Sequence, residues 1–197
     1  MRTALVMVAA LLGVAGFGCS SVTAPRSSAL PRDSALRREL LAMIDADQRV
    51  RQGFGSQMTP EQVAQMQAVD TKHTARMKTI IVEHGWPGRS FVGDDGARAA
   101  WLLVQHADAS FMTQCLPLME NAVSRGEASA KDYAYLLDRV RMKQGKPQVY
   151  GTQFTSGGDG KLVLHPIEDA EHVDERRRAI GLPSMAEYEK KVREVYK

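Results

Sequence analysis

The strongest constraint on the fold is the spacing of apolar side chains, which recur every three or four residues after residue 33. That spacing is typical of amphipathic helices with one face buried. Leu36, Leu40 and Met43 share such a face, and Asp47 interrupts it. We expect a series of helices, the third continuing or bending into the fourth, over residues 33–52, 59–84, 97–108, 111–124, 129–143, 168–180 and 184–196.

One segment favours strands instead. Residues 148–154 and 161–164 flank a loop rich in serine and glycine, which is typical of a β-hairpin with a longer turn. On a strand, Tyr150 and Thr152 would share one face and Gln153 would lie on the other. The predicted fold class is therefore mainly α (α+β), with one helical bundle-like domain over residues 33–197 and one small β-hairpin.

The first 32 residues have a different character. Arg2 is followed by an uncharged apolar run over residues 4–18, shorter than the roughly 20 residues of a membrane-spanning helix. We interpret residues 1–18 as a signal peptide. The segment ending in Cys19 is similar to a bacterial lipobox, although Gly16 and Phe17 depart from its usual pattern. A lipidated Cys19 is the leading prediction, and cleavage without lipidation is the alternative. Serine and proline then make residues 19–32 a flexible tether.

These features predict an exported protein of the cell envelope, anchored to the membrane through lipid, and to the outer membrane if the host has one. The net charge of +3 is too even to indicate a nucleic-acid partner. Only two cysteines are present, so a lipidated Cys19 would leave Cys115 alone, and we expect Cys115 to be a buried apolar residue.

Several polar residues interrupt the apolar faces. Asp70 and His73 lie on the face of the second predicted helix, and an apolar run over residues 99–104 leads directly to Gln105 and His106. Buried polar groups need partners, so these residues form either a structural network or a polar pocket. In the second case the candidate binding residues are Gln105, Gln148, Tyr150, Gln153, Asp70 and His73. The run of arginines over residues 176–178 is more typical of a solvated face.

The chain also resembles a known family, bacterial domain-of-unknown-function family 6624. The resemblance depends on an ordered set of short motifs and covers residues 36–190. The motifs lie at residues 84–87, 105–108, 138–140, 148–153, 166–169, 177 and 181–182. The family implies no activity, but it suggests that the segments around His106, Arg139 and Tyr150 matter together.

The leading functional hypothesis is a ligand- or partner-binding module of the envelope, since no recognised catalytic motif is present. The alternative is a cofactor-free hydrolase or transferase. There His106 would be the general base, Asp108 or Asp70 would orient it, and Arg139 with Gln148 would hold an anionic or carbonyl group. We expect no cofactor, because an exported domain has little access to nucleotides. We also expect no metal site, because the histidines and aspartates have no diagnostic spacing.

Overall fold

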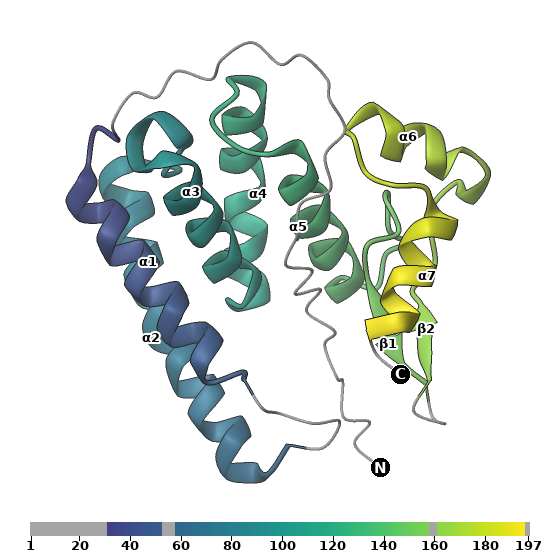
Figure 1. Cartoon of the computed structure of the whole chain (residues 1–197), viewed down its shortest axis with the longest axis horizontal. Helices are drawn as coiled ribbons and strands as arrows, with labels where there is room; N and C mark the ends of the chain where they lie inside the picture. The colour runs from purple at the N-terminus through teal and green to yellow at the C-terminus, as the bar shows by residue number, and fades with distance from the viewer. Residues whose placement is uncertain (1–30, 53–57, 158–160, 196–197) are drawn as a thin grey trace.

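A computed structural model describes residues 31–52, 58–157 and 161–195 (Figure 1). The predicted signal peptide and tether therefore lie almost wholly outside the described residues. This described part of the chain is mainly helical with one antiparallel hairpin, as predicted. The α-helices in the described part are α1 (Ser34–Arg49), α2 (Pro60–His84), α3 (Arg89–Gln105), α4 (Ala109–Ser124), α5 (Ala130–Lys143), α6 (Val173–Ala179) and α7 (Met185–Val195).

Several of these helices begin at a residue whose side chain caps the helix N-terminus. The Asp33 carboxylate accepts a hydrogen bond from the Leu36 N–H at 2.8 Å, which begins α1. Thr59 and Gln62 form a reciprocal capping box at the start of α2, with Pro60 in the first turn. Each cap satisfies backbone N–H groups that the helix itself leaves without acceptors.

The long apolar segment predicted as the third helix is divided. α3 begins earlier than expected, at Arg89, and bends at Gly93, whose φ is +78°. It ends at Gln105, so the prediction that it extends to Asp108 is wrong. Asp108 instead caps α4. The break places His106 at the end of one helix and Asp108 at the start of the next.

The first four helices surround a common core that includes Leu40, Ile80, Val104 and Met112, all completely buried. Near the start of the two helices, Arg37 of α1 bonds to Asp95 of α3. At their ends, Asp47 of α1 contacts His106, which follows α3. These two helices therefore run in the same direction, with α2 antiparallel beside them (Figure 1).

The C-terminal part gathers beside α5 (Figure 1). β1 (Phe154–Ser156) pairs with β2 (Leu162–Leu164), and Phe154 packs with Tyr188 of α7. Residues 148–153 were predicted to form a strand, but they do not, because their backbone groups bond mostly to side chains. A short 3₁₀ helix (Ala170–His172) precedes α6, where one continuous helix was expected. Within the described ranges, no helix is both long and apolar enough to cross a membrane.

Candidate functional site

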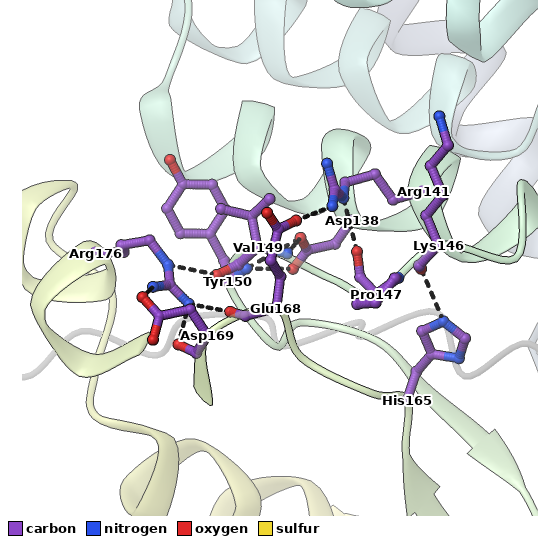
Figure 2. A network of polar contacts seen from close by, with 10 residues as sticks. All are labelled: Asp138, Arg141, Lys146, Pro147, Val149, Tyr150, His165, Glu168, Asp169 and Arg176. Carbon is purple, nitrogen blue, oxygen red and sulfur yellow. Dashed lines mark hydrogen bonds and ion pairs between the residues drawn. The ribbon is translucent and has the colours of Figure 1, made fainter. Parts of the chain in front are cut away.

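The Asp138 carboxylate organises the segment that the sequence analysis took for a strand. Asp138 is completely buried on α5. It accepts hydrogen bonds from the backbone N–H groups of Val149 at 2.7 Å, Tyr150 at 3.1 Å and Thr152 at 3.0 Å, and from the Thr152 hydroxyl. Figure 2 shows this turn of chain folded over the carboxylate. Burial raises the pKa of Asp138, although these hydrogen bonds oppose the rise.

Gln148, Gln153 and Arg139 complete the same network. The Gln148 amide donates to the carbonyls of Gln153 and His165 and accepts from the Gln153 N–H at 2.6 Å. Arg139 donates from Nε to the Gln153 side chain and from Nη1 to the Gln105 carbonyl at 2.9 Å. These predicted site residues are therefore turned inward and hold the loop, which favours the structural network for this part of the chain.

The arginines of α6 close this network from the other side. Arg177 is completely buried, and it donates to the carbonyls of Tyr150 and Pro183 while lying against the ring of Tyr188. Arg176 donates to the carbonyls of Val149 and Glu168 (Figure 2). The prediction of a solvated arginine face holds for Arg178 alone.

His106 and Asp108 do not meet. The Asp108 carboxylate accepts from the Phe111 N–H at 2.8 Å, which lowers its pKa, and it lies 3.4 Å from the Lys78 ammonium. Both contacts follow from its position at the start of α4. Asp108 therefore cannot orient His106, and that part of the catalytic hypothesis is wrong.

The partner of His106 is Asp47 of α1. The Nδ1 atom of His106 lies 3.0 Å from each carboxylate oxygen of Asp47. Arg51 joins Asp47 to Asp70, with distances of 2.6 Å and 2.5 Å between nitrogen and oxygen. We call Asp47, Arg51, Asp70 and His106 the Asp47 cluster. It lies where α1 and α3 end, beside the first half of α2.

Burial within the Asp47 cluster is graded. The Asp47 side chain is 1% exposed, that of His106 7% and that of Asp70 21%. Burial opposes ionisation of Asp47, but the hydrogen bond and charge of His106, with the charge of Arg51, outweigh it. The pKa of Asp47 therefore lies below its usual value. The cluster holds an ionised carboxylate inside and opens to solvent at Asp70.

His73 and Gln105 are buried residues close in sequence to members of this cluster. His73 lies three residues after Asp70, and Gln105 directly precedes His106. Burial lowers the pKa of His73, although the charges of Asp47 and Asp70 oppose it, and its Nδ1 has no partner among the described residues. The Gln105 amide is likewise buried without a hydrogen-bond partner in that part of the chain. Both predicted binding residues are therefore interior, and neither extends the open side of the cluster.

The Asp47 cluster has the donor set of a metal site. One ligand atom each from Asp47, Asp70 and His106 lies within 4.8 Å of the others. Arg51, however, already bonds to both carboxylates, so a cation would have to displace a guanidinium. The arrangement is therefore better suited to holding an imidazole than to holding an ion.

Among the residues proposed from the sequence, the structure brings His106 and Asp70 into one cluster, and it brings Arg139, Gln148 and Gln153 into the buried loop network. Arg51 was not identified from the sequence, and Asp47 was noted only as an interruption of an apolar face. The four-residue spacing of Asp47 and Arg51 on one helical face was an available signal. Cys115 is buried as predicted, and burial raises its pKa to about 12, so it is a thiol at neutral pH.

The chain belongs to a family of unknown function, DUF6624, which it matches over residues 34–197. The match covers all the helices described above. Comparison with curated proteins gives no match, and comparison with solved structures gives none either.

Proposed function

We propose that this chain is a membrane-tethered protein of the bacterial cell envelope that binds a polar ligand at the Asp47 cluster. The observation that carries the proposal is the contact of His106 Nδ1 with both oxygens of the buried Asp47 carboxylate. A carboxylate can only accept hydrogen bonds, so Nδ1 carries the proton. When the ring is neutral, Nε2 is then an acceptor, and we propose that the ligand binds this neutral form.

The Nε2 atom is the group that would contact the ligand. It makes no hydrogen bond with the described residues, and the His106 side chain is 7% exposed. Asp70, beside it, offers a partly exposed carboxylate whose second oxygen has no partner in the described part of the chain. Two acceptors within one cluster, Nε2 of the neutral ring and the Asp70 carboxylate, fit a ligand that donates, such as one carrying hydroxyl or amine groups.

The predicted lipid anchor supports an envelope role for this site. A lipidated Cys19 would hold the domain at a membrane surface, with residues 19–32 as the connection. A site there would meet envelope components rather than cytoplasmic nucleotides. The tether and the ligand site are separate parts of the proposal and can be tested separately.

The ligand site is tested by incubating the purified chain with a low-molecular-mass extract of cell envelopes and identifying retained compounds by mass spectrometry. We expect the wild-type chain to retain a hydroxyl- or amine-bearing compound that the His106→Gln variant loses. Asp45→Asn is the matched control, because Asp45 lies on α1 close to Asp47 in sequence but is exposed and pairs only with Arg49 among the described residues. Equal retention by wild type and His106→Gln would reject the site.

A second function, proton transfer to or from a substrate, is favoured by the same contact. A carboxylate that fixes the tautomer and orientation of an imidazole is the usual support of a histidine general base. In that case the wild-type chain would convert an extract component instead of retaining it. The conversion would disappear in His106→Gln and persist in Asp45→Asn.

A further inference from the structure

A cavity of about 370 Å³ lies at the end of the bundle opposite the Asp47 cluster. It forms where α2 ends, α3 begins and α4 ends, beside Arg32, which lies two residues before α1. Its charged and titratable lining residues are Arg32, His84, Arg125 and Glu127. The volume is at the lower end of the range for small-molecule sites. The cavity is independent of the site proposed above.

The start of α3 is already occupied by a side chain of the protein. The Glu127 carboxylate accepts from the Ser90 N–H at 2.8 Å, and the Glu127 carbonyl accepts from the Arg89 N–H at 3.0 Å. Gly88 permits this approach, because a Cβ there would lie 2.6 Å from the Glu127 carboxylate. Any ligand in the cavity must therefore be held by groups other than the helix terminus.

Two arginines supply such groups. The guanidinium groups of Arg32 and Arg125 make no ion pair or hydrogen bond with the residues that the structure describes, and Arg32 lies 5.5 Å from the centre of the Phe91 ring. Glu127 is the one carboxylate among the described lining residues, so it balances only one of the two charges. Guanidinium groups bind carboxylate and phosphate oxygens through paired hydrogen bonds.

The remaining walls are aromatic. The rings of His84 and Phe91 are in contact, with centroids 5.3 Å apart. Trp86 also lines the cavity, is 8% exposed, and has a buried indole N–H with no acceptor among the described residues. Aromatic walls favour a flat or cyclic body.

We propose that this cavity binds a small ring compound carrying one phosphate or carboxylate group. Arg32 and Arg125 bind the anionic group, and His84, Trp86 and Phe91 pack against the ring. The proposal gives a role to the segment over residues 84–87, which the Asp47 cluster does not involve.

The test measures binding of phenyl phosphate and benzoate to the purified chain by NMR, following the Trp86 indole N–H signal, which a Trp86→Phe variant assigns. We expect phenyl phosphate or benzoate to bind about 10-fold more tightly than phenol or inorganic phosphate, because each of the latter lacks one half of the contact. The double variant Arg32→Gln, Arg125→Gln should weaken binding by at least about 10-fold.

Arg49→Gln is the control for lost charge, because Arg49 is exposed and lies at the far end of α1. It should bind as the wild type does. Both substituted arginines of the cavity are exposed, so the double variant should keep the wild-type circular dichroism spectrum. Absence of binding by both anions, or equal binding by the double variant and the wild type, would overturn the proposal.

Discussion

At the scale of single residues, two buried aspartates have different partners and different consequences. Asp138 is surrounded by backbone N–H groups and a hydroxyl, and the result is a fixed loop. Asp47 is surrounded by Arg51, His106 and Gln48, and the result is an imidazole held in one orientation. A buried carboxylate is costly in either setting unless it is fully bonded.

The Asp47→Asn variant tests the ionised state of this carboxylate. Because its pKa in the folded chain is below the usual value, its contacts stabilise the fold fully above the unfolded carboxyl pKa of about 3.9. The stabilisation is lost as the pH falls through the lowered value. We expect a loss of about 2–3 kcal/mol in the free energy of unfolding at pH 7. Urea unfolding should show the difference from wild type shrinking below about pH 4.

Asp45→Asn is again the control. The Asp45 carboxylate is 64% exposed, and surface pairs contribute about 0–1 kcal/mol. A difference between Asp47→Asn and wild type that stays constant from pH 7 to pH 3 would contradict ionisation of Asp47 in the folded chain.

At the scale of elements, helix type and order could be predicted because apolar spacing and capping residues are local signals. The break after Gln105 was not predicted, because the segment over residues 97–108 has no proline or glycine at that point. The loop over residues 148–153 is not the predicted strand, since its backbone bonds mostly to side chains, among them Asp138 of α5 and Arg177 of α6, that only the tertiary fold brings to it. His106 was identified as a candidate, but its pairing with Asp47 depends on the packing of α1 against α3.

Gly151 is a position in this loop at which a side chain has no room. Its φ is +66°, and a Cβ there would lie 2.7 Å from side-chain atoms of Ile167 and Met185. We expect Gly151→Ala to lower the free energy of unfolding by about 2–4 kcal/mol, combining backbone strain with overpacking.

Gly145→Ala separates the two causes. Gly145 has a similar φ of +71°, but a Cβ there meets nothing within 4 Å, so only the backbone cost of about 1–2 kcal/mol should remain. Equal losses for the two variants in thermal unfolding would contradict the packing argument at Gly151.

At the scale of the whole molecule, the bundle has two polar ends with different chemistry. Asp70 and His106 lie at one end, and two arginines, only one of whose charges Glu127 balances, lie with aromatic rings at the other. Three other motif residues, Arg139 on α5 and Gln148 and Gln153 in the loop beside it, hold the structure together. We propose that polar ligands bind at these two ends of the helical bundle.

The proposed membrane tether would be a property of the whole chain, and Cys19→Ala tests it. We expect the wild-type chain to sediment with membranes and to have an intact mass that includes a lipid-modified N-terminal cysteine. The variant should lose both properties while its folded domain stays unchanged by circular dichroism. A mature wild-type protein that begins at or near Cys19 without lipid would show plain secretion instead.

The most direct test of the central claim is a long-range ¹H–¹⁵N NMR spectrum of the histidine rings, recorded before and after adding the low-molecular-mass envelope fraction. Before addition, Nδ1 of His106 should carry a proton. After addition, the Nε2 signal of His106 should shift, while that of the exposed His172, which pairs with Asp169, should not. An unchanged His106 signal alongside ligand-induced shifts elsewhere in the domain would contradict the assignment of the ligand site to the Asp47 cluster.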